Sequence, residues 1–137
     1  MKIVQQLNIV MPNTPGNLAT VSDRLRSSDV NITAISCTEG SPSTILHLIV
    51  DDPETAKFVL QATHKVSITD ILEFTMKHKP GAIAGIGRAC AAAGLNIRNI
   101  FATTCGKDAT IYVSVDDVAK AKMMLEEWQH GLGKFTA

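Results

Sequence analysis

Aromatic residues are scarce in this sequence and make up only 4% of its 137 positions. The apolar fraction is nevertheless 45%, so we expect a packed core built from Ile, Leu, Val, Ala and Met. An excess of charge is also lacking, because thirteen basic residues balance thirteen acidic ones. A protein that binds the phosphate backbone of nucleic acid needs a basic face. Nucleic acid is therefore not an expected partner.

Cysteine pairs and long apolar runs are missing as well. Cys37, Cys90 and Cys105 form no C-x-x-C motif, so we interpret them as small buried side chains in a reducing compartment. No run approaches the ~18 apolar residues of a membrane span, and the N-terminal stretch lacks the apolar segment of a secretion signal. We expect a cytoplasmic protein without a membrane partner.

The chain contains an internal repeat with an offset of 65 residues. Residues 12–60 align with 77–125 without a gap, and thirteen positions are identical. Ordinary composition would give about three or four such matches by chance. In both copies a Pro-Gly turn is followed, fifteen residues after the Gly, by an Asn-Ile pair. A repeat of this length that occurs only twice indicates paired domains rather than a solenoid.

Each copy predicts the order strand, helix, strand, strand, helix, strand. In the first copy the periodicity predicts strands over 2–11, 31–38 and 44–50 and helices over about 15–28 and 53–63. In the second copy it predicts a helix over 81–93, strands over 96–103 and 109–115, and a helix over 117–130. Thr14 is expected to cap the first helix, with Pro15 at its first position.

The two copies are joined without a linker. Residues 65–77 are predicted to be one extended segment that ends the first unit and begins the second, so we place the domain boundary between 1–69 and 70–137. The Gly-rich tail after residue 130 is too short to copy residues 65–71 well, so we expect the last strand of the second unit to be abbreviated or missing. The fold class is therefore α+β, with two ferredoxin-like βαββαβ units in tandem, each an antiparallel sheet with helices on one face.

The open face of the first sheet is more apolar than a solvated face needs to be. Ile45 and Ile49 are expected to point away from the helices, whereas the equivalent positions in the second unit are Thr110 and Ser114. Such a face indicates that something packs against it. A homodimer is the simplest explanation.

The repeated motif resembles the ACT domain. Each unit has a strand, then Asn or His, one residue, Pro-Gly, and an apolar pattern with Ala three residues after the Gly, followed by Asn-Ile at the second strand. Two such units joined directly are similar to small tandem-ACT proteins, and the resemblance covers about residues 2–130. ACT domains are small-molecule sensors, most often for amino acids, that regulate metabolic enzymes or transcription. The resemblance implies a ligand at an interface between two ACT units.

In that arrangement one unit supplies the strand-to-helix turn and the other supplies the Asn that opens the second strand. The candidate ligand-binding residues are those of the two turns and the two Asn-Ile pairs: Asn13, Thr14, Pro15, Gly16, Asn17, Leu18, Asn31, Ile32, His78, Lys79, Pro80, Gly81, Ala82, Asn96 and Ile97. Glycine lets the backbone approach a ligand closely, and a neutral Asn both donates and accepts hydrogen bonds. The resemblance to serine-sensing members stops at Met11 and Met76, where those members have His, which argues against serine.

Simpler interpretations of these residues remain open at this point. Asn13 could cap its helix, and Asn31 could adopt a left-handed turn conformation. His78 stands where the first unit has Asn, so the two turns are predicted to differ in affinity. The acidic pairs Asp51-Asp52 and Asp116-Asp117 stand at predicted helix starts and are interpreted as caps.

An enzyme would need a nucleophile with a base, a metal cluster or a phosphate loop, and none of these patterns occurs. We therefore expect no catalytic residue, no metal and no cofactor. An RNA-binding sheet would need stacking aromatics, and the central strands offer only Phe101 and Tyr112. The sequence predicts a non-catalytic, amino-acid-binding regulatory protein that forms a homodimer and has a metabolic enzyme as a possible partner. The alternative is a ligand-free protein–protein interaction module that acts as regulatory subunit of an amino-acid biosynthetic enzyme.

Overall fold

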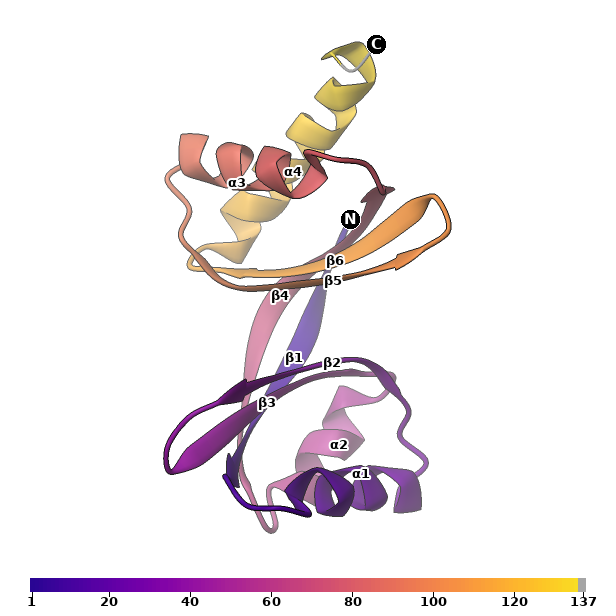
Figure 1. Ribbon diagram of the computed structural model, residues 1–137, viewed down its shortest axis with the longest axis vertical. Helices are drawn as coiled ribbons and strands as arrows, with labels where there is room; N and C mark the ends of the chain where they lie inside the picture. Colours follow the sequence, from indigo (N-terminus) through magenta and orange to yellow (C-terminus); the bar gives the residue numbers. More distant parts are fainter. Residues whose placement is uncertain (136–137) are drawn as a thin grey trace. The chain divides into compact units, whose positions relative to one another are not determined.

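The computed structural model describes residues 1–135 (Figure 1). Side chains are described through residue 131. Strands and helices follow one another in the predicted order. They are β1 (Lys2–Pro12), α1 (Asn17–Ser27), β2 (Ile32–Glu39), β3 (Ser43–Val50), α2 (Pro53–Leu60), β4 (Lys65–Lys77), α3 (Ala82–Ala92), β5 (Ile97–Cys105), β6 (Asp108–Val115) and α4 (Val118–Phe135). The predicted α+β fold of two βαββαβ-like units with antiparallel strands is confirmed.

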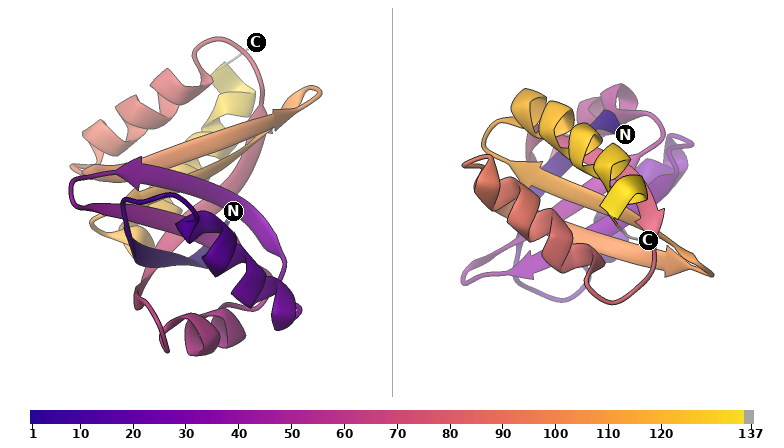
Figure 2. Two further views of the ribbon diagram at one scale, coloured as in Figure 1. Left: turned by 60° about the horizontal axis from the view of Figure 1, so that its bottom comes forward. Right: turned by 90° about the horizontal axis from the view of Figure 1, so that it is seen from above.

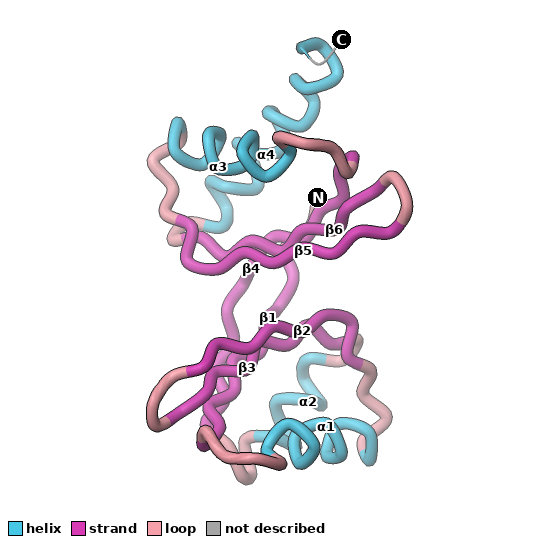
Figure 3. The backbone as a smooth tube through the Cα atoms, viewed as in Figure 1, coloured by secondary structure: helices cyan, strands magenta, loops and turns pink. Residues whose placement is uncertain are grey.

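The chain forms two compact units. The first unit is Gln5–Thr69, and the second is Met1–Val4 together with the chain from Asp70 onward. The strand order is β2-β3-β1-β4 in the first unit and β1-β4-β6-β5 in the second, so β1 and β4 contribute residues to both. In each unit the two helices cover one face of the strands (Figure 3), and Figure 2 shows α3 and α4 side by side over theirs.

The core of the first unit lies between the strands and α1 and α2. Leu7, Ile9 and Met11 alternate along β1 and are buried, and Leu7 pairs in register with the buried Leu48 of β3. Full burial of one such side chain contributes about 1.5–3 kcal/mol relative to its exposure. The strand periodicity therefore determines which face of β1 the helices cover.

The second unit repeats this core at the equivalent positions. Leu72, Phe74 and Met76 are the buried residues of β4, and Leu72 pairs with Val113 of β6. From α3 and α4 the core receives a buried side chain each at Ile86 and Leu125. The near absence of aromatic residues is thus met by aliphatic packing, as the composition predicted.

The second unit obtains its fourth strand from the other end of the chain. The tail does not form a strand in the described residues, because α4 continues to Phe135. Met1–Val4 belong to this unit instead: Met1 packs against its core, and Lys2 Nζ lies 2.9 Å from Glu73 Oε2 on β4. The sequence predicted that the terminal strand would be abbreviated or missing, but it did not predict that the first residues would replace it.

Two local predictions are wrong. Thr14 does not cap α1 and Pro15 is not its first residue, because the N-cap is Gly16 (φ 94°) and the helix begins at Asn17. Residues 12–16 form a turn in which the Thr14 N–H donates to the Pro12 carbonyl at 2.9 Å. Glycine adopts the left-handed conformation of this N-cap without strain because it has no Cβ, whereas other residues lose free energy there.

The cysteines are also not uniformly buried. Cys90 is buried in the second core, where burial raises the pKa of its thiol, but Cys37 and Cys105 are exposed. Cys37 lies on β2 and Cys105 lies on β5, and these are the outermost strands in the strand order. An edge strand has only one neighbour, which leaves its side chains less covered.

The helix-free face of the first unit carries a polar network. Of the two residues expected on this face, Ile45 is exposed, but Ile49 is buried. Gln6 Nε2 donates to Asn8 Oδ1 at 2.8 Å, and Asn8 Nδ2 donates to Thr69 Oγ1 at 2.8 Å. The His47 ring meets both amides, with Nδ1 2.8 Å from Asn8 Oδ1 and 3.2 Å from Gln6 Nε2. Partial burial lowers the pKa of His47 below its ordinary value.

This network predicts a loss of stability on acidification. Because the pKa of His47 is lower in the folded chain than in the unfolded chain, protonation favours unfolding. The contribution of neutral His47 to the stability of the fold is intact above about pH 6.5, the ordinary pKa of histidine, and is lost as the pH falls below that value. We expect the melting temperature to drop over this range and His47→Gln to weaken that drop, measured by thermal unfolding at a series of pH values. The control is His64→Gln, whose native ring contacts the Thr63 hydroxyl; equal pH dependence in both variants would refute the assignment.

An aromatic pair occupies the corresponding face of the second unit. The rings of Phe101 and Tyr112 stack with centroids 5.0 Å apart, and Tyr112 is opposite Glu73 in the β4–β6 register. Burial, followed by the hydrogen bond to Glu73 and its charge, raises the pKa of Tyr112 to about 12. The ring is thus part of the packed structure and stays neutral at physiological pH.

Candidate functional site

The two strand-to-helix turns have the same backbone. Gly16 and Gly81 both adopt left-handed conformations, at φ 94° and 89°, and each is the N-cap of the following helix. The residue three positions earlier donates its N–H to the hairpin between the second and third strands: Asn13 to the Pro42 carbonyl at 3.0 Å, and His78 to the Lys107 carbonyl at 2.8 Å. The Pro-Gly repeat therefore encodes one turn geometry twice.

The Asn13 side chain does not cap α1. Its Nδ2 donates to Glu39 Oε1 at 3.1 Å and to the Gly40 carbonyl at 3.2 Å, which ties the turn to the β2–β3 hairpin. Asn17 fixes the turn from the helix side, with Nδ2 2.8 Å from both the Pro12 and the Thr14 carbonyl oxygens. Within the described residues no donor meets Asn13 Oδ1, so this oxygen can accept from a ligand.

The Asn that opens each second strand is held by an aspartate that sequence reasoning treated only as part of a helix cap. The Asn31 N–H donates to Asp51 Oδ1 at 3.0 Å, and the Asp51 N–H donates back to the Asn31 carbonyl at 3.1 Å. Asn96 and Asp116 repeat this exchange at 3.1 and 3.3 Å. Asn31 is not left-handed; among the described residues other than glycine, only Asp29 has a positive φ (57°).

The second aspartate of each pair is the cap that the sequence predicted. Asp52 Oδ1 accepts the Thr55 N–H at 3.2 Å and Asp117 Oδ1 accepts the Lys120 N–H at 3.1 Å. Hydrogen bonds from the Thr55 side chain and backbone lower the pKa of Asp52. In each acidic pair the first aspartate holds the Asn backbone and the second caps the helix. The sequence signal that could have revealed this is that the pair and the Asn both recur at the offset of 65 residues.

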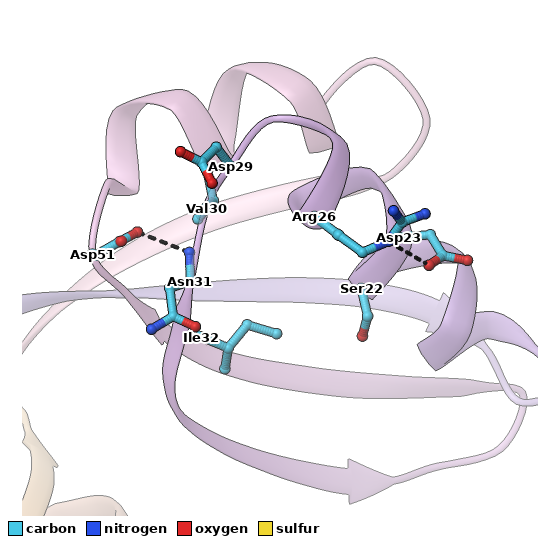
Figure 4. A pocket seen from close by; sticks show the side chains of 8 residues that line it. All are labelled: Ser22, Asp23, Arg26, Asp29, Val30, Asn31, Ile32 and Asp51. Atoms are coloured by element: carbon cyan, nitrogen blue, oxygen red, sulfur yellow. Dashed lines mark hydrogen bonds and ion pairs between the residues drawn. The ribbon is translucent and has the colours of Figure 1, made fainter.

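A pocket of about 600 Å³ lies beside Asn31 in the first unit (Figure 4). Figure 4 shows Asp29, Asn31 and Asp51 near the start of β2, with residues of α1 across from them. The pocket is lined by Ser22, Asp23, Arg26, Asp29, Val30, Asn31, Ile32 and Asp51. It presents the carboxylates of three aspartates, the Arg26 guanidinium and the Asn31 side-chain amide, and Arg26 Nε lies 3.4 Å from Asp23 Oδ1. Together these side chains can bind groups of both charges.

The equivalent surface in the second unit has different chemistry. With the offset of 65, Asp23, Arg26 and Asp29 correspond to Arg88, Ala91 and Gly94, while Asn31 and Asp51 are kept as Asn96 and Asp116. The frame around the Asn is thus conserved between the repeats, but its charges are not. This difference supports the prediction that the two units bind unequally, which remains a prediction.

A second pocket, of about 470 Å³, lies at the turn of the second unit. It includes four of the predicted residues, Lys79, Pro80, Gly81 and Ala82, but not His78. The other wall of this pocket is Trp128 of α4, which packs partly buried against the second core and was not among the predicted site residues.

Within one unit the turn and the Asn are not brought together. The turn adjoins the start of β3, where Pro12 pairs with Ser43, whereas Asn31 adjoins its end, where Ile32 pairs with Val50. Helix α1 separates them, and its 11 residues span about 16 Å at 1.5 Å per residue. Leu18 is half exposed, whereas Ile32 and Ile97 are partly buried beside their cores.

The described residues contain no group of three or more His, Cys, Asp or Glu side chains placed to hold a metal ion. Among the same residues, no helix combines the length and the apolar character needed to cross a membrane.

Comparison with known proteins decides the family. The profile of the ACT domain pair family matches residues 1–130. The chain belongs to this family. The ACT pair is similar to protein BT0572 from Bacteroides thetaiotaomicron, with 27% identity over 91% of this chain and 88% of that one and a TM-score of 0.85. The search of curated proteins found no match to this chain.

Parts of aspartate kinases share the fold of this ACT pair. The regulatory subunit of aspartate kinase from Thermus thermophilus, in its ligand-free form, aligns over 94% of each chain with 17% identity and a TM-score of 0.72. For Clostridium acetobutylicum aspartate kinase, 93% of this chain aligns with 34% of that one, at 14% identity and a TM-score of 0.58. These identities establish likeness of fold alone.

Proposed function

We propose that this ACT pair is a non-catalytic regulatory protein that binds an amino acid. The observation that supports this most is the pocket beside Asn31, which places carboxylates, a guanidinium and an amide around about 600 Å³. That volume lies within the roughly 300–1,000 Å³ of small-molecule sites. An amino acid carries an ammonium and a carboxylate, and both find partners of opposite charge in this wall.

The ligand would take its remaining contacts from a turn of another unit. Turn and Asn lie at opposite ends of α1 within a unit, so a ligand that touches both must lie where two units meet. The Pro-Gly turn offers Asn13 Oδ1 for the ammonium and an approachable backbone at Gly16. We propose a homodimer in the cytoplasm as the form that brings such surfaces together, with ligand shifting the balance between two arrangements of the units.

Thermal shift measurements with the twenty amino acids test this proposal. A ligand that binds only the folded state raises the melting temperature by mass action, and calorimetry then gives its affinity. We expect Asn31→Ala to weaken binding of the hit about tenfold or more, since it removes a polar contact to a charged group. Asn96→Ala is the matched control and should have a smaller effect. If no amino acid at millimolar concentration raised the melting temperature, the proposal of an amino-acid-binding protein would be refuted.

A second candidate function is a ligand-free interaction module that regulates an amino-acid biosynthetic enzyme. It is supported by large apolar side chains that remain exposed at equivalent positions of the helical layers. Leu18 and Ile83 are 50% and 51% exposed, and Phe58 and Met123 are 72% and 56% exposed. Repeated exposed apolar side chains favour a protein partner over solvent. A silent amino-acid panel would favour this candidate.

A further inference from the structure

The charged side chains that line the pocket at the turn of the second unit are all cationic. It is lined by Met76, Lys79, Pro80, Gly81, Ala82, Gly85, Arg88, Ala89 and Trp128. Most of these side chains are apolar, and the two charged ones are both cations. Among the described lining residues none is acidic, and in the described part of the chain neither Lys79 nor Arg88 has an ion-pair partner.

The pocket depends on the way α4 packs on α3. The Trp128 ring lies directly over Gly85, where an added Cβ would come within 2.7 Å of Cζ2. Gln129, the next residue, donates from Nε2 to the Thr75 carbonyl of β4 at 2.7 Å and anchors α4 in this position. The indole therefore forms a fixed wall beside the turn.

The first unit does not repeat this construction. Helix α2 ends at Leu60, so the position equivalent to Trp128 is Thr63, beyond the helix. The positions equivalent to Gly85 and Arg88 are Thr20 and Asp23. The extension of α4 and the charge reversal at Arg88 are thus specific to the second unit.

We propose that this pocket binds a small organic carboxylate with an apolar body and no ammonium group. The apolar walls and the indole face suit a hydrocarbon or aryl body, while Lys79 and Arg88 suit the carboxylate. An added ammonium would meet two cations and no carboxylate, so the matching amino acid is disfavoured. This selectivity is opposite to that of the pocket beside Asn31. It also departs from the expectation that the turn residues Lys79–Ala82 bind an amino acid.

Fluorescence of Trp128 provides a direct test, because it is the only tryptophan in the chain. The probes are 3-phenylpropionate and L-phenylalanine, which share a carbon skeleton and differ by the ammonium group. With emission excited where the phenyl ring does not absorb, we expect 3-phenylpropionate to change it saturably. Phenylalanine should bind at least about tenfold more weakly.

Two variants locate the binding site. Arg88→Gln removes the guanidinium from an exposed position and should weaken 3-phenylpropionate binding about tenfold. Arg26→Gln removes the guanidinium that lines the pocket of the first unit and should leave the titration unchanged. Absence of a saturable change at millimolar probe would overturn the proposal. A titration that Arg88→Gln leaves unaltered, or equal binding of phenylalanine, would overturn it as well.

Discussion

A fragment of residues 5–69 is expected to fold by itself, whereas a fragment of residues 70–137 is expected to remain largely unfolded. The first fragment contains all four strands and both helices of its unit. The second lacks Met1–Val4, which complete its sheet next to β4. Domains of this size have only about 3–5 kcal/mol of core stabilisation available, so loss of a strand and of the Met1 contact with the core is decisive.

Circular dichroism and urea denaturation of the two fragments measure this difference. The matched control is a fragment of residues 1–69, which adds the first four residues to the unit that does not contain them. Its unfolding midpoint should equal that of residues 5–69. A cooperative transition for residues 70–137 at the midpoint of the first fragment would show that Met1–Val4 are dispensable.

Gly85→Ala and Gly87→Ala are expected to change stability in opposite directions. Both glycines lie in α3, where Ala is favoured over Gly by about 1 kcal/mol. At Gly87 nothing lies within 4 Å of the added Cβ, so the full gain should appear. At Gly85 the Cβ would meet the Trp128 ring at 2.7 Å, and such overpacking costs about 1–3 kcal/mol.

Urea unfolding gives the two free energies, and tryptophan emission reports whether the indole has moved. In a Trp128→Ala background the obstacle is gone, and Gly85→Ala should then stabilise the chain as Gly87→Ala does. If Gly85→Ala stabilised the native chain without a change in emission, the close packing of the two helices would be refuted.

Much of the fold could be predicted because the same pattern is written twice. The offset of 65 residues assigned helices and strands in the second unit from those in the first, and alternation along β1 and β4 identified the buried faces. Helix ends were less certain. Thr14 has the side chain of a cap, but Gly16 is the residue that can adopt the left-handed conformation. The capping propensity of Thr14 therefore did not decide where the helix begins, and the left-handed backbone at Gly16 did.

The candidate site was only partly accessible from sequence for a different reason. The turns and the Asn-Ile pairs carry local signatures, whereas Asp51 reaches Asn31 across twenty positions and Trp128 reaches Gly85 across more than forty. Such contacts depend on how elements pack, which periodicity does not specify. The place of Met1–Val4 in the second unit belongs to the same class, because no local pattern distinguishes a strand that contributes residues to two units.

The shared first strand has a consequence for the order in which the protein is made. Residues 5–69 leave the ribosome as a complete unit and can fold while the rest is being synthesised. Met1–Val4 then stand at the end of a finished strand, where they offer free backbone groups to β4 before β5 and β6 have been translated. Because Met1–Val4 precede residues 70–137 in the chain, this strand edge exists before the rest of the second unit has been translated.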